Sequence, residues 1–128
     1  MSGGIERRTS VRKVIRMQCV ARFSSGLEVN GITRNLSLNG AEIEASAISG
    51  TSSRIPAPGE LGLLTLKFRH AGAPDSMMVQ CQVVHILANG MGLSAQFSDL
   101  SKREQVMLGM MLASGRAQIE DVIDDDAA

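Results

Sequence analysis

The chain has 128 residues, 44% of them hydrophobic, so it is long enough to bury one core and is expected to form a single domain. It has no Trp or Tyr and only three Phe, which removes the aromatic stacking platform of single-stranded nucleic-acid binders and argues against a general RNA-binding role. No run of about 18 apolar residues occurs, so we expect neither a membrane span nor a signal peptide in this chain.

The net charge is zero, but the charges are unevenly spread. Residues 6–22 hold one acidic side chain, Glu6, and six basic ones, which are Arg7, Arg8, Arg12, Lys13, Arg16 and Arg22. This basic head predicts an anionic partner, whereas the acidic end of the chain is expected to be a solvated tail. At the two ends of the chain, residues 1–5 are expected to be a disordered leader or a remnant of cloning, and residues 115–128 a disordered acidic tail.

Alternation of apolar and polar residues predicts six short strands. In the first of them, the inward positions are Ile15, Met17, Cys19, Ala21 and Phe23. The predicted strands cover residues 15–23, 27–35, 41–45, 61–68, 77–87 and 91–97. A loop rich in Ser, Gly and Pro is expected over 49–60, and the Asn89-Gly90 pair is typical of a hairpin turn.

The spacing of apolar residues changes from every second residue to every third or fourth after Ser101. Residues Ser101-Lys102-Arg103-Glu104 form a capping-box pattern. An amphipathic helix is predicted over 101–114, ending near Gly115. Its stripe consists of Val106, Met107, Met110 and Met111, and we expect it to face the core, covering the open end of a barrel or packing on a neighbouring domain. The whole pattern predicts an all-β fold: a six-stranded antiparallel, Greek-key-like β-barrel with a C-terminal α-helix.

Residue types that catalysis requires are sparse, which predicts a binding module rather than an enzyme. His85 is expected to share the face of Cys81 and Val83 and to be a core or barrel-end histidine, and His70 is expected to be solvated in a loop. Cys19 and Cys81 have no partner at metal-ligand spacing and are expected to be buried free thiols in a reducing cytoplasm. We find no zinc spacing, phosphate-binding Gly-rich loop or paired carboxylates, so no metal is expected.

Two segments carry residues suited to an anionic ligand. Arg7, Arg8 and Arg12 precede the first predicted strand, and each guanidinium offers two parallel donors to phosphate oxygens or to guanine O6 and N7. Asn35 and Ser37 lie two apart, so in an extended strand their side chains point the same way toward a purine edge.

Taken together, the two segments resemble the signature of the PilZ domain family. That signature is an Arg, three residues and an Arg, followed later by Asp or Asn, one residue, Ser, two residues and Gly. Arg8 and Arg12 match the first motif, and Asn35, Ser37 and Gly40 match the second. Gly40 allows a bulge, a positive φ or a close approach of the backbone.

The resemblance covers roughly residues 6–114 and implies a barrel that receives cyclic di-GMP on its outer surface, beneath the N-terminal arginine segment. By the match, the two motif arginines would bind phosphate and guanine, the motif Asn and Ser would bind a guanine edge, and the motif Gly would shape the turn. Arg7 is the position at which family members with Arg bind an intercalated ligand dimer. The chain departs from the commonest pattern at Asn35, where the family often has Asp, and at Asn39, where it often has Gly.

The function that this resemblance implies is a cytoplasmic cyclic di-GMP sensor, with no metal, no nucleic acid polymer and no direct membrane insertion. Its arginine segment would order on ligand binding and re-aim an N-terminal or separate effector domain. Two settings stay open: part of a larger glycosyltransferase, such as a bacterial cellulose synthase catalytic subunit, to which residues 113–117 are similar, or a stand-alone regulator of motility or exopolysaccharide synthesis.

Two other functions stay open as well. One is a degenerate PilZ-like adaptor that binds only protein partners through its Met-rich helix. The other is nonspecific binding of DNA or RNA by the basic head, which predicts a steep salt dependence and no preference for guanine.

Overall fold

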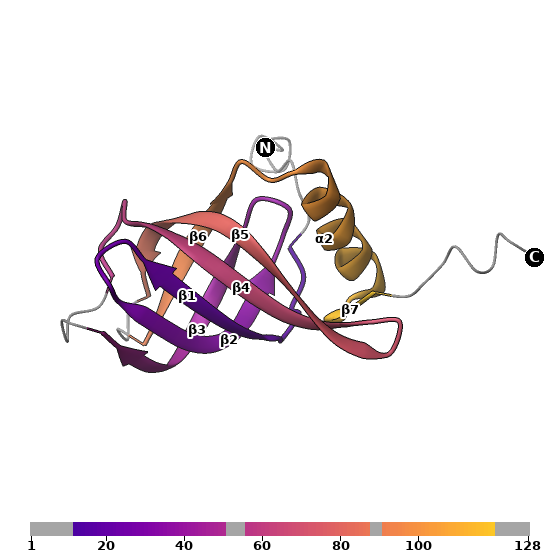
Figure 1. Cartoon of the computed structure of the whole chain (residues 1–128), viewed down its shortest axis with the longest axis horizontal. Helices are drawn as coiled ribbons and strands as arrows, with labels where there is room; N and C mark the ends of the chain where they lie inside the picture. The colour runs from indigo at the N-terminus through magenta and orange to yellow at the C-terminus, as the bar shows by residue number, and fades with distance from the viewer. Residues whose placement is uncertain (1–11, 51–55, 88–90, 120–128) are drawn as a thin grey trace, which may run out of the picture.

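A computed structural model describes residues 12–50, 56–87 and 91–119. These residues form a closed barrel of six antiparallel strands, a short extra strand and one helix (Figure 1). The elements in chain order are β1 (Gln18–Phe23), β2 (Glu28–Leu36), β3 (Gly40–Ser49), β4 (Leu61–His70), β5 (Ala73–Ile86), β6 (Gly92–Ser98), α2 (Lys102–Ser114) and β7 (Gln118–Ile119). The predicted fold, a six-stranded antiparallel barrel with a C-terminal helix, is confirmed.

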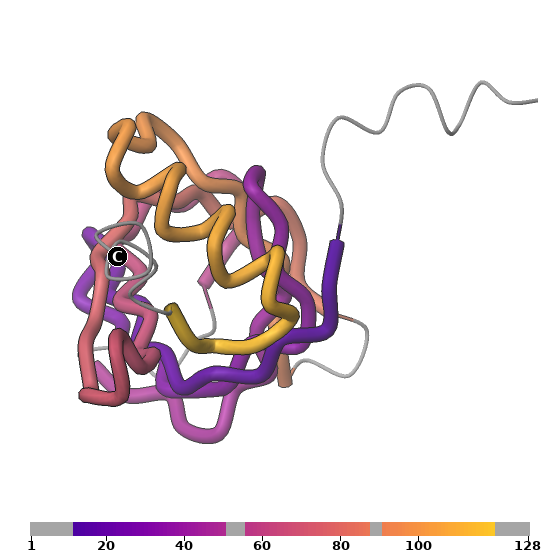
Figure 2. The backbone as a smooth tube through the Cα atoms, turned by 90° about the vertical axis from the view of Figure 1, so that its right-hand side faces the viewer, coloured from indigo at the N-terminus to yellow at the C-terminus, as the bar shows by residue number. Residues whose placement is uncertain are grey.

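The strands follow the order β1-β2-β3-β6-β5-β4, and a β1–β4 pairing closes the ring. The β3–β6 pairing joins two strands that are far apart in the sequence. Figure 2 shows the strands as a ring with α2 lying across one open end. Closure leaves none of the six barrel strands with an unpaired edge, which protects a small sheet from pairing with other chains.

One hydrophobic core fills the barrel. Alternate residues of every barrel strand point inward, and they are mostly aliphatic, as the scarcity of aromatic residues requires. The most deeply buried large side chains are Ile15, Leu27, Leu36, Ile43, Leu64, Leu66, Leu108, Met111, Ile119, Val29, Val79 and Val83. Each such side chain contributes about 1.5–3 kcal/mol through the apolar surface that it removes from water.

The helix begins and ends as its sequence predicts. The Ser101 hydroxyl accepts a hydrogen bond from the backbone N–H of Glu104 at 3.1 Å, and the Glu104 carboxylate accepts one from the backbone N–H of Ser101 at 3.0 Å. Gly115 adopts a φ of 74° as the C-cap, and its N–H donates to the carbonyl of Met111 at 2.8 Å. The capping box and the terminating glycine are therefore both present.

The buried face of α2 differs from the predicted stripe. Met107 and Met111 are buried as expected, but Val106 and Met110 are 50% and 40% exposed. The helix instead presents the adjacent row, Leu108 and Leu112, to the barrel. Successive residues on a helix are separated by about 100° around its axis. The stripe predicted from the Met spacing therefore lies to one side of the face that contacts the barrel.

The fold also continues past the predicted end of the domain at residue 114. Gln118 and Ile119 form β7, which pairs in parallel with Arg69 and His70 of β4. The backbone N–H of Ala71 donates to the carbonyl of Ile119 at 2.8 Å, and the Ile119 side chain is buried in the core. Gln118 and Ile119, which were expected to lie in the tail, therefore pair with the sheet.

Several strand boundaries also differ from the prediction. β1 begins at Gln18 rather than Ile15, and β3 extends to Ser49, into the predicted loop. β5 begins at Ala73, and a tight turn at Ala71 and Gly72, with φ of 52° and 84°, joins it to β4. The Asn-Gly hairpin signal lies outside the described residues. Within the described residues, no helix is long and apolar enough to cross a membrane.

His70 lies at the end of β4 and not in a free loop, as the sequence suggested. Its Nδ1 is 3.3 Å from Oδ2 of Asp75. The pKa of the Asp75 carboxyl is lowered, first by a hydrogen bond from the backbone N–H of Ser76 and then by His70. Both side chains are exposed, and they lie on the two strands that the β4–β5 turn joins.

The two cysteines are buried free thiols, as predicted. Burial raises the pKa of Cys19 to about 12 and that of Cys81 to about 11, because a thiolate would lose its hydration inside the barrel. Both side chains therefore act as small hydrophobic residues of the core.

Candidate ligand-binding site

A cavity of about 210 Å³ opens on the outside of the barrel, where the β2–β3 turn meets β6. Its lining residues are Arg12, Asn35, Leu36, Ser37, Asn39, Gly40, Ala41, Glu42, Val84, Ser94, Ala95 and Gln96. Four of the six predicted ligand residues, Arg12, Asn35, Ser37 and Gly40, are among them. The other two, Arg7 and Arg8, lie outside the described residues.

A β-bulge in β2 turns Asn35 toward the cavity. Thr33 pairs with Ile43 and Asn35 pairs with Glu42, so Arg34 is an extra residue on β2. Thr33 points into the core, and without the bulge Asn35 would share that inward face. With it, the Asn35 amide lies at the surface and donates from Nδ2 to Oε1 of Glu42 at 3.0 Å.

A second bulge, in β5, borders the cavity from the other side. Val83 pairs with Ala95 and His85 pairs with Ser94, so Val84 is the extra residue. Val83 stays in the core, while Val84 is exposed and lines the cavity. The prediction that His85 shares the face of Cys81 and Val83 was wrong, because it assumed unbroken alternation, and the bulge places His85 on the outside.

Ser37 shapes the turn between β2 and β3. Its hydroxyl accepts hydrogen bonds from the backbone N–H groups of Asn39 at 3.1 Å and Gly40 at 3.2 Å. Both lone pairs of the hydroxyl are therefore used within the turn. The O–H itself donates to the carbonyl of Gly40 only over 3.4 Å, so it is the part of Ser37 that could turn to a ligand.

Gly40 is required by the neighbouring strand rather than by its φ angle. A Cβ at this position would lie 2.3 Å from the carbonyl oxygen of Ala95 and 3.2 Å from Cα of Gln96. The absent side chain thus lets β3 and β6 approach closely at the floor of the cavity.

The segment before β1 is fastened beside the cavity. Lys13 and Leu36 exchange backbone hydrogen bonds of 2.9 and 2.8 Å. The buried Thr33 hydroxyl accepts from the N–H of Met17 at 3.0 Å and donates to the carbonyl of Ile15 at 2.5 Å. These bonds determine where the chain meets β2, and they place Arg12 on the cavity rim.

The lining of the cavity contains both a cation, Arg12, and an anion, Glu42. Arg12 is exposed at the rim, and among the described residues no carboxylate pairs with its guanidinium. Glu42 enters from β3 with one carboxylate oxygen bound to Asn35. Such a lining suits a ligand that carries both an anionic group and hydrogen-bond donors.

The PilZ domain family model matches residues 6–114. The chain belongs to the PilZ family. PilZ domains are a family of cyclic di-GMP receptors with a binding and regulatory role rather than a catalytic one. The matched range holds both sequence motifs and all the residues that line the cavity.

Solved structures show the same fold. Inhibitor of motility (MotI/DgrA) of Bacillus subtilis is similar with a TM-score of 0.64 and 15% identity, over 80% of this chain and 47% of that one. This PilZ domain therefore spans about half of that protein. The PilZ domain of CeSA from a cellulose-synthesizing bacterium has a TM-score of 0.56 and 11% identity, over 81% of this chain and 96% of that one. No curated protein sequence matches the chain significantly.

Sequence reasoning missed part of the site of this PilZ domain. Ser94 and Gln96 line the cavity from β6, and no local pattern indicates that β6 pairs with β3. Glu42 also lines the cavity, and its place opposite Asn35 was not recognised from the sequence. A signal existed, because a short turn between two strands places the polar residues that flank it across from one another.

The potential metal-ligating side chains of this PilZ domain are scattered over its described residues. Residues 12–50, 56–87 and 91–119 contain no group of three or more His, Cys, Asp or Glu side chains that could hold a metal ion. The donors that line the cavity are a guanidinium, amides and hydroxyls, which suit phosphate groups and nucleobases.

Proposed function

We propose that this PilZ domain binds cyclic di-GMP in the cavity between the β2–β3 turn and β6 and acts as a regulatory sensor. One observation carries the proposal. Arg12, Asn35, Ser37 and Gly40, which come from two motifs separated by a strand hairpin, line the same cavity. Neither motif alone would predict this meeting.

The size of the cavity indicates how the ligand would bind. At about 210 Å³ the cavity is smaller than the roughly 300–1,000 Å³ of typical small-molecule sites. It therefore accommodates one guanine base, with the remainder of the ligand lying on the barrel surface under the arginine segment. Arg8 precedes Arg12 by four residues, a length of chain that spans at most about 14 Å, so its guanidinium can reach the same ligand.

Binding would act on the chain that leaves the barrel at Lys13. The backbone bonds between Lys13 and Leu36 anchor this point, so charge-assisted bonds from Arg8 and Arg12 to the ligand would order the preceding segment against the cavity. An effector would respond to the ordering of this segment. The effector would be either a domain N-terminal to the segment or a separate cytoplasmic protein. Arg7 would bind the second molecule of an intercalated ligand dimer.

The pathway we propose is control of motility or of exopolysaccharide synthesis, such as cellulose. The two similar structures are named as an inhibitor of motility and as the PilZ domain of a cellulose-synthesis protein. In this role the domain regulates and does not catalyse, so any catalysis would belong to a larger protein of which the chain is part.

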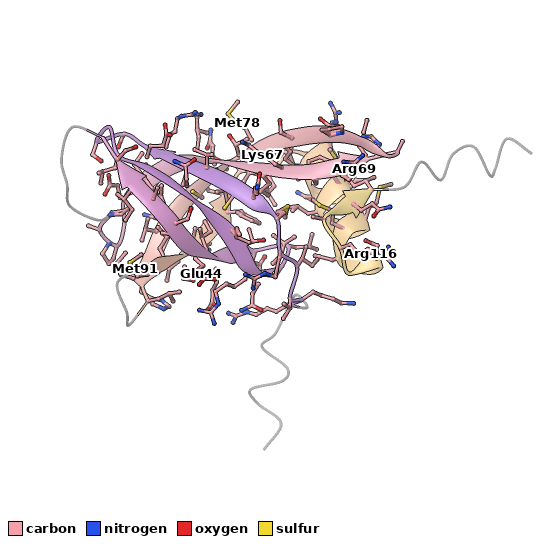
Figure 3. All side chains as sticks on the ribbon, turned by 90° about the horizontal axis from the view of Figure 1, so that it is seen from below. Glu44, Lys67, Arg69, Met78, Met91 and Arg116 are labelled. Atoms are coloured by element: carbon pink, nitrogen blue, oxygen red, sulfur yellow. The ribbon has the colours of Figure 1, made fainter. Side chains whose placement is uncertain are left out.

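Calorimetric titration tests the proposal. Cyclic di-GMP is titrated into the full chain, into an Arg8→Ala/Arg12→Ala variant and into an Arg116→Ala control, with GTP as the control ligand. Arg116 is an exposed arginine next to the end of α2 (Figure 3). We expect micromolar or tighter binding in the full chain and the control, and loss of binding in the double variant. Equal binding in all three proteins would contradict the proposal.

The second candidate is a protein-only adaptor that uses α2. The observation in its favour is that Val106 and Met110, one helical turn apart, form an exposed apolar pair on the outer face of α2. In that case no cyclic dinucleotide would produce heat, and Val106→Ser/Met110→Ser would abolish capture of the partner while leaving the barrel folded.

A further inference from the structure

Glu42 is a cavity residue that neither sequence motif contains. It lies on β3, directly across from Asn35, and is half-buried in the cavity lining. Its Oε1 accepts the hydrogen bond from Asn35 Nδ2 at 3.0 Å. Its Oε2 has no partner among the described residues, so one acceptor of a charged carboxylate remains available at the wall of the cavity.

A carboxylate in a cavity that is proposed to bind an anionic ligand needs a physical explanation. Phosphate groups would be repelled by Glu42 and attracted by Arg12, so a phosphate group of the ligand belongs next to Arg12 and away from the Glu42 carboxylate. Whatever part of the ligand approaches Glu42 must offer hydrogen-bond donors, because a carboxylate can only accept.

The guanine base has donors in the required arrangement. Its N1–H and its exocyclic N2 amino group lie side by side on the Watson–Crick edge, and a carboxylate can accept from both. Adenine has no amino group at C2 and presents an unprotonated N1, whose lone pair would face the carboxylate. A site built to accept from a ligand donor discriminates strongly against an analogue that lacks it.

We propose that Glu42 is the guanine-specificity residue of this site, with Asn35 as the residue that positions its carboxylate. This inference rests on the proposed function, since it assigns a role within the same cavity. Arg12 then contributes affinity for any cyclic dinucleotide through phosphate, whereas Glu42 determines which base is accepted.

The test compares two ligands that differ only in their bases, cyclic di-GMP and cyclic di-AMP. Both are titrated calorimetrically into the full chain and into Glu42→Gln, in which a neutral amide replaces the carboxylate but can still accept from Asn35. A hydrogen bond to a charged group corresponds to about a tenfold to hundredfold change in affinity. We expect Glu42→Gln to lose that factor for cyclic di-GMP and to lose the preference over cyclic di-AMP.

Two further variants make the test specific. Glu44→Gln is the matched control, because Glu44 lies two residues along β3 on the outside of the barrel and does not line the cavity (Figure 3). Asn35→Asp/Glu42→Gln exchanges the two groups of the cross-strand pair, so an amide still faces a carboxylate. We expect the exchange to recover most of the lost guanine preference and Glu44→Gln to match the full chain.

The outcomes separate this inference from the proposed function. If the full chain binds cyclic di-GMP and Glu42→Gln binds it equally well with the same preference, the role of Glu42 is refuted and the sensor function stands. If the full chain binds neither ligand, both are overturned. Thermal melting of each variant shows whether the barrel is folded, and Glu42→Ala provides a second removal of the carboxylate if Glu42→Gln melts early.

Discussion

The close approach of β3 and β6 at Gly40 predicts a large effect from a single methyl group. In Gly40→Ala the new Cβ would lie 2.3 Å from the carbonyl oxygen of Ala95, whereas ordinary contacts begin near 3.4 Å. The obstacle is backbone and cannot rotate away, so the strands must separate by about 1 Å. The adjacent backbone bond from Phe97 N–H to the carbonyl of Asn39, now 2.7 Å, would be stretched with them.

Overpacking of this kind costs about 1–3 kcal/mol. For a chain of this length each kcal/mol shifts Tm by about 3–5 °C, so Gly40→Ala is expected to lower Tm by about 3–15 °C. Gly109→Ala is the matched control, because a Cβ there meets nothing within 4 Å and α2 gains a better helix former. That variant should raise Tm by about 2–5 °C, from about 0.5–1 kcal/mol.

Melting curves followed by circular dichroism measure both variants. Opposite shifts for the same Gly→Ala change would establish that the β3–β6 contact, and not the loss of glycine itself, limits stability at residue 40. A Gly40→Ala protein that melts with the parent chain would refute the reasoning, because it would mean that the two strands have room for the methyl group.

Three further changes test other parts of the structure. Thr33→Val removes the hydroxyl that binds the segment before β1, and it leaves the buried N–H of Met17 without its side-chain partner. The variant should lower the free energy of unfolding in denaturant by about 1–3 kcal/mol and accelerate amide exchange at Met17. Unchanged exchange at Met17 would contradict this. Cys19 and Cys81 should react with Ellman's reagent at pH 8 only on unfolding. Burial raises the pKa of Cys19 from 9.0 to about 12 and that of Cys81 to about 11, so the contribution of these neutral thiols to stability is present below pH 9 and lost as the pH rises toward 12. Rapid labelling of the folded chain would refute the burial of the two thiols. A chain that ends at Ile119 should melt like the full chain. Removal of β7 as well should lower the free energy of unfolding by about 2–5 kcal/mol, because Ile119 is buried. Equal Tm values for the chains with and without β7 would show that β7 is dispensable.

Most of the barrel could be predicted because its strands alternate regularly and its helix carries both end signals. The failures occur where alternation breaks. Arg34 and Val84 are extra residues in bulges, and each reverses the direction of the side chains that follow it. A bulge depends on how a strand fits its partner, which a single sequence does not encode locally, and this is why His85 was assigned to the same face as Cys81 and Val83.

The candidate site was partly predictable for the same reason. Arg12, Asn35, Ser37 and Gly40 lie in motifs that stand out in the sequence, and all four line the cavity. The residues that β6 contributes depend on the β3–β6 pairing, which joins strands distant in the sequence, whereas the Asn35–Glu42 pairing lies across the short β2–β3 turn and could have been predicted. β7 was missed because a pair of residues is too short to produce a periodic pattern.

The exposed pair on α2, Val106 and Met110, shows the limit of a hydrophobic stripe as evidence. Spacing identified the helix correctly but not the angle at which it meets the barrel. That angle is determined by which row of side chains best fills the open end, here the row of Leu108 and Leu112 with its two neighbouring Met residues.

Amide chemical shifts recorded while cyclic di-GMP is added to the ¹⁵N-labelled chain test the central claim most directly. The account predicts that the largest changes fall on the cavity lining, at Arg12, Asn35, Gly40 and Gln96, with little change at the outer face of α2. Changes confined to the helix around Met110, or no changes at millimolar ligand, would contradict the assignment of this cavity as the cyclic di-GMP site.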